Sequence, residues 1–192
     1  MKKIDNGLPT HVHESWLTCP AFDSIVLDAV KKELGKIGIH SFRPEPTRLF
    51  EAFSVDANKV KLVIVNDVWP LGQEGDGEFS PSLKMIWQKL EEVYGWEDAS
   101  MYLDTKLNDW KSQNVLLLNL SLTNVKGEIW KDFMLHLFEW LSGEPRIYVF
   151  LNSKAFDYSK YAKGSIYYGF WPKEIVAEMN KDGGYFLLGL PF

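Results

Sequence analysis

The sequence predicts one α/β domain over residues 1–192, a three-layer α/β/α arrangement around a four-stranded, mostly parallel sheet. The length of 192 residues suits a single domain. Four short apolar runs alternate with segments of helical periodicity, a pattern typical of parallel strands joined by right-handed crossovers. The two middle runs are almost entirely apolar, as expected for strands that are buried on both faces.

The expected strands are the four apolar runs themselves. They are Lys61–Val65, Val115–Leu118, Ile147–Leu151 and Ser165–Tyr168. Each is short and rich in branched or aromatic residues, which favour extended backbone.

The clearest expected helix has apolar residues at helical spacing from Leu83 to Val93. Ser80 stands where an N-cap belongs, and Pro81 follows at the first helical position. Gly95 is expected to end the helix.

Three further helices are expected from the same kind of spacing. One has its apolar stripe from Phe22 to Val30, with Gly35 just past its end, and another covers Phe133–Leu141 and is closed by Gly143. The last begins at Pro172 and continues through Met179.

Composition restricts the function classes. Apolar residues make up 46% of the chain, enough for a sizeable core, and no apolar run approaches the length of a membrane span. The net charge of −5 argues against strong non-specific binding to nucleic acid. The single cysteine excludes an internal disulfide and a cysteine-cluster metal site, and no apolar segment follows the N-terminal lysines, so we expect a cytoplasmic protein.

Polar side chains follow the predicted strands where each strand ends. They are Asn66 and Asp67 after the first strand, Asn119 after the second, Asn152 and Ser153 after the third, and Trp171 shortly after the fourth. The carboxyl ends of parallel strands meet at one edge, where α/β folds bind their ligands. Amides, a carboxylate and aromatic rings at one edge suit a flat, hydrogen-bonding heterocycle. Asp67 is either a general base or a strand-end residue that bonds local backbone.

The histidines offer little chemistry. His11 and His13 form a short pair near the N-terminus, but a metal site needs more ligands, so we expect no metal. His136 lies in an otherwise apolar helical pattern and is expected to be structural.

Several segments together resemble the family 1 uracil-DNA glycosylases, in order along nearly the whole chain. They are Ser15-Trp16, the proline-containing stretch from Arg43 to Phe53, the strand Leu62–Val65, the segment Phe79–Ile86 (FSPSLKMI), the segment Asn114–Thr123 (NVLLLNLSLT) and Trp130–Leu141. The resemblance implies the fold of that family and an activity that hydrolyses the N-glycosidic bond of a base extruded from DNA.

The signature segments of that family are altered in this chain. Its water-activating loop reads Gly-Gln-Asp-Pro-Tyr-His, where this chain has Asn66-Asp67-Val68-Trp69-Pro70-Leu71. Counted directly from the strand, Asp67 falls on the Gln position, whereas a one-residue deletion would place it on the Asp position. In the second signature, Trp171 replaces the His, and the family's Gly-Ser turn after the third strand is Asn152-Ser153 here.

The resemblance also implies roles for individual residues. Asp67 would be the catalytic carboxylate. Asn119 would read the N3–H and O4 of uracil, with Phe79 stacking on the base, Trp69 excluding a 5-methyl group and Trp171 in place of the histidine.

DNA contacts are expected from five positions at the same edge. They are Ile175 as the apolar wedge, Ser82, Ser153, Lys173 and Arg43.

Two functions therefore remain open from the sequence. One is a divergent DNA glycosylase that recognises a flipped uracil or altered pyrimidine, with weak or altered excision. The other is a catalytically inactive relative that binds DNA, a base or a protein partner. No cofactor is expected, and the predicted partner is DNA, bound weakly and with steep salt dependence, or a protein.

Overall fold

The computed structural model describes residues 11–38, 41–67, 80–95, 107–125 and 128–181. Its centre is a four-stranded sheet in the order β2-β1-β3-β4, and all three strand pairs are parallel. The strands are β1 (Leu62–Asn66), β2 (Leu116–Asn119), β3 (Arg146–Phe150) and β4 (Gly164–Tyr168). The predicted fold class is therefore confirmed, and each predicted strand is found within one or two residues of its expected ends.

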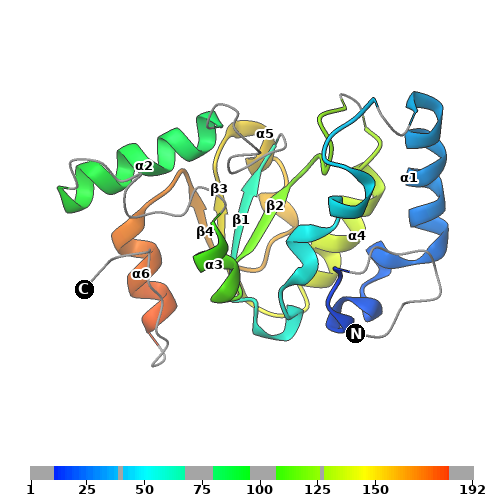
Figure 1. Cartoon of the computed structure of the whole chain (residues 1–192). Coiled ribbons are helices and arrows are strands. Elements are labelled where there is room, and N and C mark those ends of the chain that lie inside the picture. Colours follow the sequence, from blue (N-terminus) through cyan, green and yellow to red (C-terminus); the bar gives the residue numbers. More distant parts are fainter. Residues whose placement is uncertain (1–10, 39–40, 68–79, 96–106, 126–127, 182–192) are drawn as a thin grey trace.

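Helices cover both faces of the sheet (Figure 1). One side carries α1 (Ser24–Ile37) and α4 (Lys131–Leu141), and the other carries α2 (Pro81–Tyr94) and α6 (Pro172–Asn180). Two short helices also lie in the described part of the chain, α3 (Asn108–Ser112) before β2 and α5 (Ser153–Phe156) after β3. Short 3-10 turns lie at Glu14–Thr18, Pro20–Phe22, Pro46–Arg48, Glu51–Ser54, Ala57–Lys59 and Ser159–Tyr161.

Alternation along the strands divides the core into two clusters. In β1, Val63 and Val65 pack into the cluster beneath α1 and α4, whereas Leu62 and Ile64 pack into the one beneath α2 and α6. All four side chains are fully buried. This two-sided burial is why these strands read as continuous apolar runs rather than as alternating ones.

The ends of α2 follow the prediction. The Ser80 hydroxyl accepts a hydrogen bond from the Leu83 amide at 3.1 Å, Pro81 occupies the first helical position, and Gly95 ends the helix in the left-handed conformation. The prediction for α1 is wrong by one turn, because Gly35 lies inside the helix, which continues to Ile37 and ends at Gly38 with φ of 94°. An exposed glycine is tolerated within a helix at a cost of about 1 kcal/mol. The presence of Gly35 therefore did not mark the C-terminal end of α1.

Candidate functional site

The carboxyl edge of the sheet holds two adjacent asparagine side chains. Asn66 and Asn119 are the last residues of β1 and β2 and are partners in the parallel register. Their side chains therefore point to the same face of the sheet, the face covered by α2. Both are buried, and the Nδ2 of Asn66 donates to the Oδ1 of Asn119 at 3.2 Å.

The third strand supplies the residue that orients this pair. Asn152 follows β3 and caps α5, where its Oδ1 accepts a hydrogen bond from the backbone N–H of Ala155 at 2.9 Å. A backbone amide can only donate, so the oxygen of Asn152 must face α5 and its Nδ2 must face Asn66 and Asp67. That Nδ2 donates to the Oδ1 of Asn66 at 3.1 Å.

The direction of every bond in the cluster follows from that one backbone donor. The Oδ1 of Asn66 accepts from Asn152 and also from the Ser82 hydroxyl at 2.7 Å, so the Nδ2 of Asn66 is its outward donor. Asn119 therefore turns its oxygen toward Asn66, and its own Nδ2 has no hydrogen-bond partner among the described residues. We call the chain from Ala155 through Asn152 and Asn66 to Asn119 the amide relay.

Asp67 lies at the same edge of the sheet, but its side chain is bonded to Asn152 rather than to Asn119. Its Oδ1 accepts from the Nδ2 of Asn152 at 2.8 Å, and its Oδ2 lies 3.9 Å from the Nζ of Lys154 on α5. Its backbone oxygen accepts from the Ser121 amide at 3.3 Å. The place beside Asn119 is taken by Asn66.

Trp171 stands at the N-cap of α6, close after β4. Its side chain is 49% exposed, and its indole N–H donates to the carbonyl oxygen of Tyr168 at 2.8 Å. The one hydrogen-bond donor of this ring is therefore used within the protein.

The remaining predicted residues other than Arg43 divide into four groups. Ser82 is half-buried and bonded to Asn66 of the amide relay. Ser153 and Lys173 are exposed in the first turns of α5 and α6. Ile175 is fully buried in the core beneath α6, so its side chain is not presented to a duplex. Phe79 and Trp69 lie outside the described residues.

Arg43 is exposed on the loop before β1, near the carboxyl edge of β2. Its backbone N–H donates to the Oδ1 of Asn124 at 2.7 Å, and its backbone oxygen accepts from the Asn124 amide. Because Asn124 follows β2 closely, these bonds attach the loop to the same edge as Asn119.

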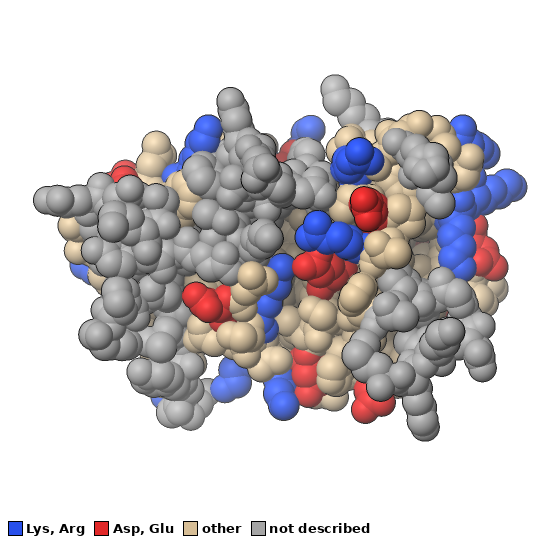
Figure 2. Space-filling model, in the orientation of Figure 1, with Lys and Arg blue, Asp and Glu red and all other residues tan. Residues whose placement is uncertain are grey.

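Charges of both signs are interspersed over the described part of the face shown in Figure 2. Blue and red side chains alternate across its centre, without a continuous basic stripe on the described surface of that face. This distribution agrees with a chain whose net charge is −5.

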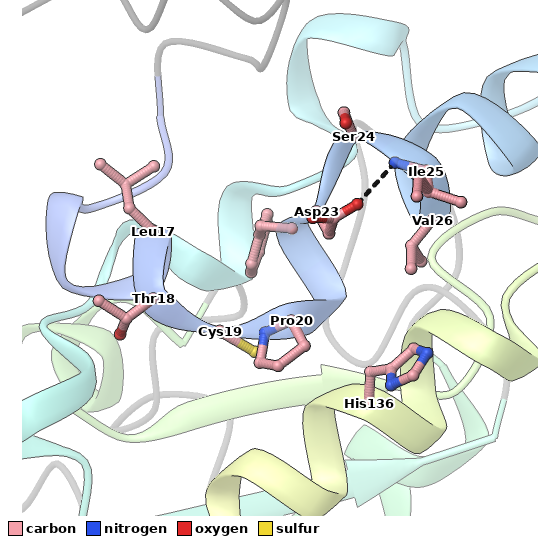
Figure 3. Close-up of a pocket in the computed structure, with 10 residues that line it drawn as sticks. Leu17, Thr18, Cys19, Pro20, Asp23, Ser24, Ile25, Val26 and His136 are labelled. Carbon is pink, nitrogen blue, oxygen red and sulfur yellow. Dashed lines mark hydrogen bonds between the residues drawn. The ribbon is translucent and has the colours of Figure 1, made fainter.

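A separate pocket of about 660 Å³ lies beside the start of α1 (Figure 3). It is lined by residues from Leu17 to Val26 and by His136 of α4, and it contains none of the predicted site residues. His136 is half-buried there, 3.9 Å from the Glu139 carboxylate. Among the described residues, no group of three or more His, Cys, Asp or Glu is placed to hold a metal ion.

Solved structures of uracil-DNA glycosylases superpose on this chain. The crystal structure of mimivirus uracil-DNA glycosylase matches with a TM-score of 0.69 at 17% identity, covering 82% of this chain and 68% of that one. A mimivirus UNG variant in complex with UGI gives 0.76 at 14% identity, covering 92% and 88%. A UNG variant from Nitratifractor salsuginis gives 0.60 at 16% identity, covering 88% and 93%.

The chain has the uracil-DNA glycosylase fold. No protein-family model and no curated protein sequence matches it. In the described part of the chain, no helix is both long and apolar enough to cross a membrane.

Sequence reasoning placed Asn119 and Asp67 at this edge but missed the part played by Asn66 and Asn152. The available signal was that amide side chains follow neighbouring strands, since buried amides require partners.

Proposed function

We propose that this protein uses its uracil-DNA glycosylase fold to recognise a flipped uracil or another altered pyrimidine in DNA, with weak or altered excision of the base. The observation that carries the proposal is the fixed amide of Asn119. Its oxygen retains one free lone pair beside Asn66, and its Nδ2 is available as a donor. An acceptor and a donor side by side complement the N3–H and O4 of uracil.

The surroundings support recognition more than turnover. Cleavage of the glycosidic bond places negative charge on the departing base, and a preorganised donor to such a charge is worth about 10²–10³ in rate. The Trp171 N–H is bound to Tyr168, and the Asp67 carboxylate is bound to Asn152. Neither arrangement favours a fast hydrolase, so we expect uracil excision to be absent or at least about 100-fold below that of an efficient glycosylase.

The same two contacts favour a second candidate, a catalytically inactive protein that binds DNA, a base or a protein partner. Mimivirus UNG is found in complex with the protein UGI, so a protein partner for a surface of this fold has a precedent. The candidates differ in one measurable property, because only the glycosylase releases a free base.

The test compares single-stranded oligonucleotides that are identical except for one central deoxyuridine or deoxycytidine. Wild-type protein should bind the uracil oligonucleotide more tightly, and Asn119→Ala should remove that preference. The matched control is Asn58→Ala, because this exposed asparagine lies in the turn Ala57–Lys59 before β1 and does not contact the amide relay. Equal binding of both oligonucleotides by the wild type would refute the proposal.

Excision is measured on the same oligonucleotides by alkaline cleavage and gel analysis. Slow release of uracil that requires Asn119 supports the first candidate, whereas selective binding without release supports the second. Because the net charge is −5, duplex binding should be weak and should fall steeply with added salt.

A further inference from the structure

The strand β4 ends the sheet, and one row of its backbone groups faces away from the neighbouring strand β3. The N–H of Gly169, just after β4, donates to β3 at 2.8 Å. Because backbone groups alternate between the two sides of a strand, those of Gly164, Ile166 and Tyr168 point away from β3. Among the described residues, only the Trp171 indole reaches this outer edge, where its N–H donates to the carbonyl oxygen of Tyr168.

The outer edge of β4 lacks the features by which proteins ordinarily prevent strand pairing. Charged side chains, proline and covering segments are the usual protection of an edge strand. The opposite edge of this sheet has such a cover, because the turn Glu51–Ser54 packs against β2. The sequence of β4, GSIYY, contains no charged residue and no proline. This edge is therefore suited to continuing the sheet into another chain.

The exposed side chains of β4 are apolar and lie on one face of the sheet. Ile166 and Tyr168 are 41% and 55% exposed. They pair in register with Tyr148 and Phe150 of β3, which are fully buried on the same face. Phe156 of α5 packs edge to face on Tyr168, with ring centroids 5.2 Å apart, and is itself 39% exposed. A chain that extended the sheet would therefore bury apolar surface as well as pairing the backbone groups.

The order of side-chain sizes in β4 fits a second copy of the same strand. Its small residues, Gly164 and Ser165, come first, and its large ones, Tyr167 and Tyr168, come last. Antiparallel pairing centred on Ile166 sets each large residue opposite a small one. Tyr168 then faces the partner's Gly164, and Tyr167 faces the partner's Ser165. An aromatic ring over an edge glycine is a stabilising cross-strand pair.

The outward backbone groups fit the same register. In an antiparallel pair, opposite residues alternate between pairs that exchange two hydrogen bonds and pairs that exchange none. Centring the pair on Ile166 makes the residues with outward groups, Gly164, Ile166 and Tyr168, the ones that exchange bonds. The strand carries no charge, so this register sets no like charges opposite each other.

We propose that two copies of this chain join through β4, antiparallel about a two-fold axis at Ile166, to form one continuous sheet. The surface is self-complementary, as a two-fold interface requires, because small residues at one end of the strand receive large residues from the other end. The dimer goes beyond the proposed function and does not depend on it, since it involves neither Asn119 nor a nucleic acid.

Sedimentation equilibrium across the micromolar range measures this association, because a strand of five residues gives a small interface and a reversible dimer. With rising concentration, the wild type should shift from 22.2 kDa towards twice that mass. Ile166→Lys should raise the dissociation constant at least about 10-fold, because it sets two ammonium groups opposite each other. Ile166→Val keeps an apolar side chain and the backbone N–H, so it should retain association.

Ile166→Pro removes a backbone donor at the centre of the pair. That N–H points away from β3, so the folded monomer loses no strand bond, and proline is tolerated at such an edge position. Association should be lost, while the circular dichroism spectrum and the urea midpoint stay close to those of the wild type. Ile25→Lys is the control, because Ile25 is 80% exposed on α1, away from β4, and its replacement should leave association unchanged.

A cysteine at the axis tests the register. Residues in a hydrogen-bonded antiparallel pair have Cα atoms about 5.5 Å apart, within the span of a disulfide. Mild oxidation of Ile166→Cys should therefore give a covalent dimer, whereas Ile25→Cys should stay single at the same concentration. The native Cys19 is buried, so it should not compete.

The proposal is overturned by a wild type that sediments as a monomer at every concentration. It is also overturned by association that persists in Ile166→Lys or is lost in Ile25→Lys, since either result places the contact elsewhere. If Ile166→Cys forms no covalent dimer, the register is wrong. None of these samples contains DNA, so their failure leaves the proposed function standing, and equal binding of uracil and cytosine oligonucleotides leaves the dimer standing.

Discussion

Substitution of Asn66 by aspartate should reverse the pyrimidine preference of this protein. In the wild type, the Nδ2 of Asn66 donates to the Oδ1 of Asn119 at 3.2 Å and so fixes which end of the Asn119 amide faces Asn66. A carboxylate at this position has no hydrogen to donate and can only accept. Asn119 would then rotate its amide by half a turn and present its Nδ2 to the new carboxylate.

This rotation exchanges the positions of the donor and the acceptor that the Asn119 amide offers to a base. Uracil offers a donor at N3 and an acceptor at position 4, and cytosine offers the reverse, so the fixed amide fits one and opposes the other at two hydrogen bonds. An unsatisfied buried polar group costs about 1–3 kcal/mol, so two mismatched bonds cost about 2–6 kcal/mol. The wild type should therefore prefer uracil over cytosine by about 30-fold or more, and Asn66→Asp should prefer cytosine.

The other contacts of residue 66 allow this substitution to fold. The oxygen of Asn66 accepts from Ser82 at 2.7 Å and from Asn152 at 3.1 Å, and an aspartate at that position accepts the same two bonds. Asn66→Ala, in contrast, leaves the Asn119 amide without an orienting partner, and its preference should approach unity. Ser82→Ala removes one donor but keeps Asn66 oriented by Asn152, so it is the matched control and should keep the wild-type preference.

The assay is competition between single-stranded oligonucleotides with one central deoxyuridine or deoxycytidine, followed by anisotropy. Side-chain ¹⁵N spectra of Asn119 give a second readout, because the chemical shifts of its amide protons depend on what the amide faces. An Asn66→Asp protein that folds and still prefers the wild-type base would show that Asn66 does not set the orientation of Asn119.

Further predictions concern stability, thiol chemistry and catalysis. Gly164→Ala should destabilise the protein by about 4 kcal/mol or more in urea unfolding, because φ is +127° and an added Cβ would lie 2.0 Å from the carbonyl oxygen of Arg146. Gly35→Ala, where an added methyl meets nothing, should instead stabilise by about 0.5–1 kcal/mol. Burial raises the pKa of the Cys19 thiol to about 11, so at pH 8 the native thiol should react with iodoacetamide about 100-fold more slowly than in urea; equal rates would contradict that burial. Trp171→His should leave uracil excision unchanged in the gel assay, since among the described residues no carboxylate is bonded to Asn119, and a clear gain would place Asp67 in the catalytic position.

Local sequence determined the elements and their order. Ser80, Pro81 and Gly95 fix the ends of α2 through capping and backbone preference, which act within a few residues of the chain. The continuous apolar runs of β2 and β3 indicated strands buried on both faces, and the alternation of strands with helices indicated parallel pairing. Since parallel strands share a carboxyl edge, the sequence also predicted that Asn119 and Asp67 lie at one edge.

Only the tertiary structure decided what those side chains contact. Asn66 and Asn152 are 86 residues apart in the chain, and the bond between them depends on the register between β1 and β3. The direction of Asp67, toward Asn152 rather than Asn119, and the burial of Ile175 likewise depend on packing between distant segments. Hydrogen-bond direction is set by geometry across strands, so no local pattern could have revealed that the backbone N–H of Ala155 fixes the amide that would read the base.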